Sequence, residues 1–245
     1  MRQQPEQQAP PVQRLRIRYA KRGRLRFTSH RDFSRAFERA VFRARIPMAY
    51  SSGFNPHPRI SYAGAAPTGS ASEAEYLEIG LAEVLDPAHV HALLSDSLPD
   101  GLDVLEVRPS PGGSLADLLE ASHWRIELRA DRAAAEAAAA AFLATAEIPV
   151  ERMTKKGLRS FDCRAAVVAL AVLPAEDGAP GDAVELDLVL RHGTPSVRPD
   201  DVLAGLCGVA GFAPAEGVAP LLTRLAQGPL DPATGAVGDP LATSA

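Results

Sequence analysis

The stretch RLRIRYAKRGRLRFTSHRDFSRAFERAVFRAR (residues 14–45) decides the fold of the first half of the chain. Its beginning alternates between basic and apolar residues, which predicts a strand with Leu15, Ile17 and Tyr19 on the face toward the core. The arginines between them then fall on the opposite face of the sheet. After a basic turn, residues 25–27 are expected to continue in an extended conformation.

A helix is predicted next, because Thr28 or Ser29 can cap it and Pro47 ends it after Arg45. Apolar residues recur at the spacing of a helix that packs one face on a core: Phe33, Ala36, Phe37, Ala40, Val41 and Ala44. Arginines at every fourth position follow a second face: Arg31, Arg35, Arg39 and Arg43. The helix is therefore predicted to be apolar on one side and basic on another.

The rest of the chain repeats one pattern of elements. Strands are predicted at 58–63, 73–81 and 102–108, with a helix at 87–98 after the cap and proline of Asp86-Pro87. The resulting order, β-α-β-β-α-β, is the ferredoxin-like pattern. A second series follows, with strands at 123–130, 148–154, 160–173, 184–191 and 217–226 and helices at 131–147 and 199–207.

The chain is therefore predicted to be an α+β protein of two tandem ferredoxin-like units, at 14–110 and 120–225. The second unit is degenerate, because it carries one strand more than the first. Residues 1–13 are rich in Gln and Pro, and residues 226–245 are rich in Pro, Gly and Ala. Both ends are therefore expected to be disordered.

The composition is that of an ordinary globular protein, with 46% apolar and 23% charged residues among 245. No apolar run is long enough for a membrane span, and the N-terminus lacks the apolar core of a secretory signal. The two cysteines, Cys163 and Cys207, are far apart and define no disulfide framework. A cytoplasmic location without membrane association is the expectation.

The net charge of −4 hides a strong asymmetry along the chain. Residues 14–59 hold 13 Lys and Arg against 2 Asp and Glu, a net charge of +11. Residues 60–245 hold 12 Lys and Arg against 27 Asp and Glu, a net charge of −15. The basic segment suits an anionic partner such as RNA, and the alternative is that the two halves of the folded chain attract each other.

Arginines of the first strand and helix are candidates for phosphate contacts, because a guanidinium group binds phosphate oxygens in a bidentate way. The candidates are Arg16, Arg18, Arg31, Arg35 and Arg39. The alternative is that acids pair with the basic helix, as Glu73, Glu75 and Glu78 could. A second basic cluster is interpreted as a solvated hairpin: Lys155, Lys156, Arg159 and Arg164.

The segment SSGFNPHPRISYAGAAPTG (51–69) is interpreted as a stiff recognition loop, with an ordinary crossover as the alternative. Gly53 permits conformations that other residues avoid, and the prolines hold their predecessors extended. Phe54 is expected to anchor the loop in the core. The side chains that it would present to an anion or RNA are Ser52, Asn55, His57 and Arg59.

His30 and His57 are weak candidates for acid–base catalysis, because a histidine exchanges protons near neutral pH. Asp32, beside His30, is explained by the favourable interaction of an acid with a helix N-terminus. The sequence contains no cysteine spacing typical of a metal site and no phosphate-binding glycine loop. No metal and no cofactor are therefore expected.

Two stretches carry a resemblance to a known family: TSHRDFSRAFERAVFRARIP (28–47) and YSSGFNPHPRISYAGAAPTGSASEAEYLEIGL (50–81). They resemble the bacterial radical SAM-linked protein family, an uncharacterised domain found beside or fused to radical SAM proteins. Its most specific pieces are Ser29-His30 with Asp32 and the run 52–59. The resemblance implies a radical SAM enzyme as partner. This chain lacks the three closely spaced cysteines of a radical SAM cluster, so another chain would carry that chemistry.

Three hypotheses about function follow. The leading one is a non-catalytic accessory protein that binds RNA and serves a separate radical SAM enzyme. The second is a protein–protein module whose basic face docks on that enzyme without RNA. The third is a metal-independent RNA-processing enzyme that uses His30 or His57 as acid–base.

Overall fold

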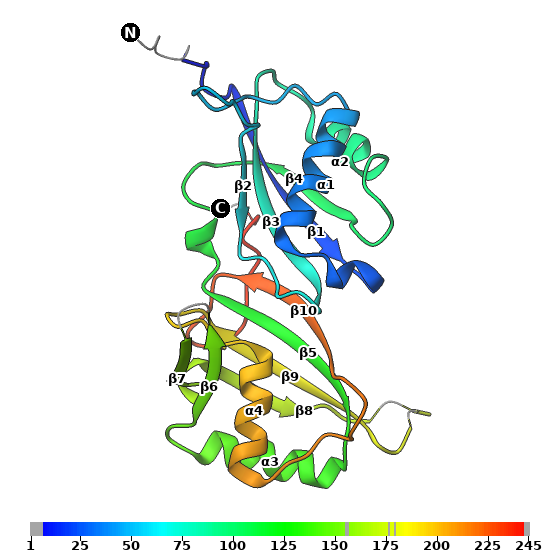
Figure 1. The fold of residues 1–245 in the computed structure, drawn as a ribbon, viewed down its shortest axis with the longest axis vertical. Helices are drawn as coiled ribbons and strands as arrows, with labels where there is room; N and C mark the ends of the chain where they lie inside the picture. The colour runs from blue at the N-terminus through cyan, green and yellow to red at the C-terminus, as the bar shows by residue number, and fades with distance from the viewer. Residues whose placement is uncertain (1–6, 155–156, 176, 179, 243–245) are drawn as a thin grey trace. The chain divides into compact units, whose positions relative to one another are not determined.

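The computed structural model describes residues 7–154, 157–175, 177–178 and 180–242. The chain divides into two compact units, unit 1 (Met1–Leu118 with Pro240–Ala245) and unit 2 (Leu119–Asp239). In its described residues, each unit combines an antiparallel sheet with two α-helices (Figure 1). The predicted α+β class is confirmed.

Unit 1 follows the order β-α-β-β-α-β along the chain, apart from two 3-10 helices. Its strands and helices are β1 (Gln13–Lys21), η1 (Gly23–Phe27), α1 (His30–Arg43), β2 (Ile60–Ala63), β3 (Ala71–Leu81), α2 (Pro87–Ser95), β4 (Val104–Pro109) and η2 (Ala116–Leu118). The strands pair antiparallel in the order β4-β1-β3-β2. β1 therefore has a partner strand on each side.

The core of unit 1 lies between one face of this sheet and the two α-helices. Leu15, Ile17 and Tyr19 of β1 are buried in the same cluster as Phe33 and Phe37 of α1. The rings of Tyr19 and Phe33 stack with their centroids 4.3 Å apart. The alternation predicted for β1 is confirmed, and its arginines lie on the face away from the helices.

Unit 2 repeats this arrangement with a hairpin added. Its strands and helices are β5 (Ala121–Arg129), α3 (Arg132–Ala144), β6 (Pro149–Thr154), β7 (Gly157–Asp162), η3 (Arg164–Ala166), β8 (Val167–Val172), β9 (Ala183–Arg191), α4 (Pro199–Ala210) and β10 (Leu221–Gly228). Four strands pair antiparallel in the order β10-β5-β9-β8, while β6 and β7 form a separate hairpin. Without that hairpin, the order of elements and of paired strands is the same as in unit 1.

Two predicted elements are wrong. Residues 25–27 belong to η1, where the N–H of Thr28 donates to Leu25 O at 2.9 Å after a left-handed Gly23. The predicted strand at 160–173 is split into β7 and β8 by η3. It is split because the Asp162 carboxylate accepts the backbone N–H groups that follow it and turns the chain.

The described parts of both ends carry local contacts. β10 continues to Gly228, and Leu230 then pairs with Val237 in an isolated bridge. Residues 1–6 and 243–245 lie outside the described residues, and disorder of the two ends stays a prediction. None of the helices found in the described ranges has the length and apolar character needed to cross a membrane.

Candidate functional site

The helix α1 begins at the cap that the sequence indicates. The Ser29 hydroxyl oxygen accepts the backbone N–H of Asp32 at 3.2 Å, and the hydroxyl donates to the Asp32 carboxylate at 2.7 Å. Phe33 and Phe37 are 3% and 1% exposed. Because these rings fix the inner face of the helix, its arginine face is turned to solvent.

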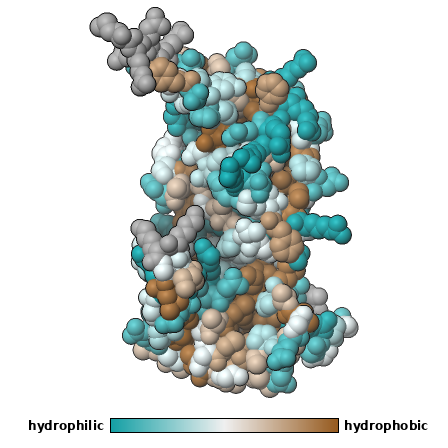
Figure 2. Space-filling view, viewed as in Figure 1, coloured by the Kyte–Doolittle hydropathy of each residue, from teal (hydrophilic) through white to brown (hydrophobic). Residues whose placement is uncertain are grey.

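The arginine face of α1 presents cations without ion pairs. Within the described residues, Arg31, Arg35 and Arg39 are exposed and have no hydrogen-bond or ion-pair partner. Arg43 donates to a backbone oxygen at 3.3 Å, and Glu38 is the acid of this helix beyond its first turn. Figure 2 shows hydrophilic side chains gathered over the part of unit 1 where Figure 1 draws α1.

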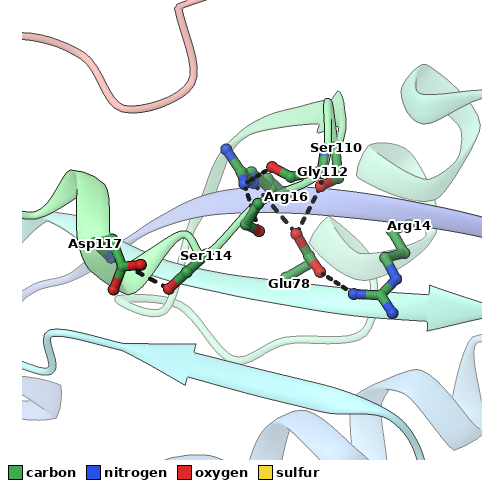
Figure 3. Close-up of polar contacts among 8 residues, drawn as sticks. Arg14, Arg16, Glu78, Ser110, Gly112, Ser114 and Asp117 are labelled. Atoms are coloured by element: carbon green, nitrogen blue, oxygen red, sulfur yellow. Dashed lines mark hydrogen bonds and ion pairs between the residues drawn. The ribbon is translucent and has the colours of Figure 1, made fainter.

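The arginines of β1 are paired instead. Arg16 is 2% exposed, and its Nε lies 3.2 Å from Glu78 Oε2 (Figure 3). Its Nη2 also donates to the carbonyl oxygens of Gly112, at 2.7 Å, and Gly113, at 3.2 Å. Arg14 binds the second oxygen of Glu78 at 3.3 Å. Arg16 therefore fastens the loop after β4 to the sheet.

The next arginines along the chain are paired as well. Arg18 Nη2 lies 3.7 Å from Glu106 Oε2, and Arg22 binds both Glu73 and Asp103. The hydrogen bond to Glu73 raises the pKa of Arg22 above its ordinary value. Two of the acids on β3 thus pair with arginines of β1 and the turn after it, and not with α1. Phosphate binding by the strand arginines would require these pairs to break.

The loop between α1 and β2 is held closed at its base, and we call it the 50–59 loop. Tyr50 pairs with Pro58 in an isolated bridge. The N–H of Ser51 donates to His57 O at 2.9 Å, and the N–H of His57 donates to Ser51 Oγ at 3.0 Å. Arg59 Nε donates to Tyr50 O at 3.0 Å. These bonds hold the loop in one conformation.

The tip of the 50–59 loop is exposed, and the anchoring role predicted for Phe54 is wrong. Phe54 is 73% exposed, because the hydrogen bonds at the base, and not a buried ring, hold the loop. Gly53 has a φ of 138°, which favours glycine. Asn55 and His57 are exposed, and Ser52 accepts a backbone N–H from the N-terminal segment at 3.0 Å. The polar side chains of the tip are therefore accessible.

No contact among the described residues brings the two catalytic candidates together. His30 occupies the first position of α1, and its ring meets the edge of Tyr62 with centroids 5.1 Å apart. His57 is exposed in the loop. Burial raises the pKa of Tyr62 to about 12, and the charge of Glu38 adds to this effect. Tyr62 thus packs against His30 but keeps its proton at neutral pH.

The buried ionisable groups of unit 2 have structural partners. Asp201 lies 2.5 Å from Arg152 and accepts the N–H of Arg198 at 2.7 Å, while burial raises its pKa. Burial also raises the pKa of Cys163 to about 11 and lowers the pKa of His192. A thiol with such a pKa is protonated and unreactive at neutral pH, so Cys163 acts as a core residue.

The structure describes two of the four residues of the second basic cluster. Lys155 and Lys156 lie outside the described residues. Arg159 is exposed on β7, and Arg164 donates to the carbonyl oxygen of Val167 at 3.0 Å. In the described ranges, no three His, Cys, Asp or Glu side chains come together in a group that could hold a metal ion.

Two aromatic residues beside the arginine face were missed by the sequence analysis. Phe42 is 83% exposed on α1, and Tyr50 is 42% exposed at the base of the 50–59 loop. A signal for Phe42 was present, because it lies outside the apolar set of the helix and next to Arg43. No comparable signal existed for Tyr50, since its position depends on how the chain turns after α1.

Comparison with known proteins identifies a family but no activity. The sequence matches no curated protein. A family model matches residues 14–199, from β1 to the start of α4. Its description names neither RNA nor a radical SAM protein. Since the match spans more than half of the sequence, the chain belongs to DUF2344, a family of uncharacterized proteins conserved in bacteria.

Proposed function

We propose that this chain is a non-catalytic RNA-binding accessory protein, and that a separate radical SAM enzyme is its partner. The observation that carries the RNA proposal is the row of exposed guanidinium groups of Arg31, Arg35 and Arg39 on α1, which pair with none of the described residues. An RNA strand offers phosphates at regular intervals, which suits a row of cations on one face.

The spacing of these arginines supports a bound anion. Like charges four residues apart on a helix repel each other by ~0.2–0.5 kcal/mol per pair. On the strand β1, comparable repulsion is relieved by Glu78 and Glu106, and among the described residues no acid does so for these three arginines. A phosphate chain would supply the missing negative charge.

The 50–59 loop would add the more specific contacts. Asn55, His57 and Arg59 follow α1 in the chain, and the bonds at the base of the loop hold them on a stiff support. Amide, imidazole and guanidinium groups can all donate hydrogen bonds to bases or to sugar hydroxyls. Ser52 would contribute after releasing its present partner.

The fold argues for the helix rather than the sheet as the binding surface. The strand order is the same in both units, β4-β1-β3-β2 in unit 1 and β10-β5-β9-β8 in unit 2. We interpret this order, together with the β-α-β-β-α-β order of elements, as ferredoxin-like. Some proteins of such topology bind RNA on the sheet face that has no helices. In unit 1 that face carries the paired Arg16 and Arg18, so we leave these two arginines out of the proposed interface.

The RNA proposal is tested by titrating the full chain with a fluorescein-labelled single-stranded RNA of mixed sequence at several salt concentrations. We expect the affinity of the wild type to fall steeply with salt. The variant Arg31/Arg35/Arg39→Ala should bind more weakly, and the slope of log K against log salt should shrink by about 2. Its unfolding free energy should stay within about 0.5 kcal/mol of the wild type, because exposed side chains are replaced.

The matched control is Arg108/Arg125/Arg129→Ala, which removes the same charge from arginines paired with acids. This control should leave RNA affinity nearly unchanged. Binding that does not depend on salt, or equal affinities of the α1 variant and the wild type, would contradict phosphate contact by α1.

The partner is tested by crosslinking in cells, followed by purification and identification of bound RNA and bound protein. We expect a radical SAM enzyme together with RNA crosslinked near Arg31 to Arg59. Recovery of the enzyme after nuclease treatment, with no RNA, would make the basic face a docking surface for protein. Metal-independent cleavage of the recovered RNA, lost in His30→Ala or His57→Ala, would favour the RNA-processing alternative.

A further inference from the structure

A groove lies at the end of α1, between the helix and the base of the 50–59 loop. Its volume is about 530 Å³, in the range of sites for small organic groups. Phe42 and Arg45 line it from the end of the helix, Tyr50 lines it from the loop, and Glu38 lies at one side. All of these residues belong to unit 1.

The floor of the groove is apolar and fixed by the way α1 ends. Arg45 takes a φ of 53°, which is uncommon for a residue with a side chain and reverses the chain. The N–H of Ile46 then donates back to Val41 O at 3.2 Å. Met48 pairs with Leu81 in an isolated bridge, and both Ile46 and Met48 are buried. The groove is therefore formed before any ligand arrives.

Two aromatic rings border this groove and are exposed to water. Phe42 is 83% exposed and Tyr50 is 42% exposed. A single exposed apolar residue needs no explanation, but two rings that border one groove beside arginines form a patch that one ligand can contact. Burying such rings against a flat apolar partner would be favourable.

A second, shallower hollow of about 590 Å³ continues along the helix. It is lined by Arg35, Glu38, Arg39, Phe42 and Arg43. Glu38 and Phe42 border both hollows, so the arginine face leads directly into the groove. The two surfaces differ along this path: three arginines line the shallow hollow, whereas the groove is mostly apolar, with Arg45 and Glu38 as its charged lining residues.

We propose that the groove takes one unpaired base of a single-stranded RNA, stacked on Phe42 beside Tyr50, while Arg35, Arg39 and Arg43 hold the flanking phosphates. This inference rests on the proposed function. A base suits this groove better than a phosphate does, because most of the lining is apolar and the charge of Arg45 is offset by that of Glu38. A base is neutral and flat, and every base can stack on an aromatic ring.

The proposal implies a preference for single strands. The bases of a duplex are stacked and paired, so they cannot enter a groove in the protein without being pulled out of the helix. Contacts to phosphates alone would give a smaller difference between the affinities for single-stranded and duplex RNA. Single-stranded RNA should therefore bind about tenfold more tightly than the same sequence in a duplex.

The test uses the full chain with a labelled single-stranded RNA of mixed sequence, alone or annealed to its complement. Phe42→Ala should weaken binding of the single strand about tenfold and leave the salt slope unchanged, because stacking removes no counterions. Phe42→Tyr should restore most of the affinity. Leu158→Ala, which removes an exposed apolar side chain from unit 2, is the matched control and should bind as the wild type does.

The outcomes distinguish a failure of the base groove from a failure of RNA binding as a whole. If the wild type binds both RNAs with a salt dependence, but Phe42→Ala binds as tightly as the wild type, the base groove is wrong and phosphate contact by α1 stands. Equal affinities for single strand and duplex would also overturn it. If the wild type binds neither RNA, the proposed function itself fails, and the groove with it.

Discussion

Two rows of arginines in unit 1 have opposite environments. On β1, Arg16 and Arg18 each face an acid across the sheet, and Arg16 is almost completely buried. On α1, Arg35 and Arg39 are exposed, and no described residue pairs with them. Arginines therefore stabilise the fold on β1 and remain available to a ligand on α1.

The difference follows from where each element lies. Arg16 stands directly opposite Glu78 in the β1–β3 register, although the two residues are 62 positions apart in the chain. A strand inside a sheet meets residues of both neighbouring strands at close range. A helix on the outside of a sheet has, on its outer face, only its own residues three and four positions away. On α1 those neighbours are mostly arginines.

The largest expected effect is a loss of stability when an arginine of β1 is removed. We expect Arg16→Ala to lower the unfolding free energy by about 3 kcal/mol, because it leaves the largely buried Glu78 without its closest cation. Denaturant unfolding of the full chain measures this loss. RNA affinity of the folded variant should change less than twofold, in contrast to the α1 triple variant.

A variant that replaces both members of the Arg16–Glu78 pair is the control for this test. Replacing both partners, Arg16→Met with Glu78→Leu, should recover part of the stability, since no buried charge is left alone. If Arg16→Ala were as stable as the wild type and bound RNA more weakly, the contrast between the two rows of arginines would be wrong. Arg16 would then belong to the binding surface, as the sequence analysis first suggested.

The smallest expected effect concerns the acid on the arginine face of α1. Glu38→Gln removes the acid that lies among the arginines of α1 and leaves the shape of the side chain nearly unchanged. We expect RNA affinity to rise about twofold at low salt, with the gain shrinking as salt screens the added charge. Weaker binding of this variant, with the salt slope unchanged, would indicate that Glu38 accepts a hydrogen bond from a base.

Local patterns were enough to predict most elements. Alternation identified β1, the 3.6-residue period and the Ser29 cap identified α1, and Asp86-Pro87 marked the start of α2. Predictions that depended on the contacts of individual side chains were less successful. Phe54 was assigned to the core from its apolar character alone, and the break at Asp162 depends on bonds from its side chain to the backbone.

Most of the order of strands and helices, the basic face of α1 and the charge asymmetry could be predicted from the sequence. These properties depend on residues within a few positions of one another, so periodicity and composition reveal them. Three features became evident only in the folded chain: the β1 arginines are paired, Phe42 and Tyr50 border one groove, and the base of the 50–59 loop is closed. The first depends on strands that are far apart in the sequence, and the other two depend on how the chain turns after α1; periodicity and composition reveal neither.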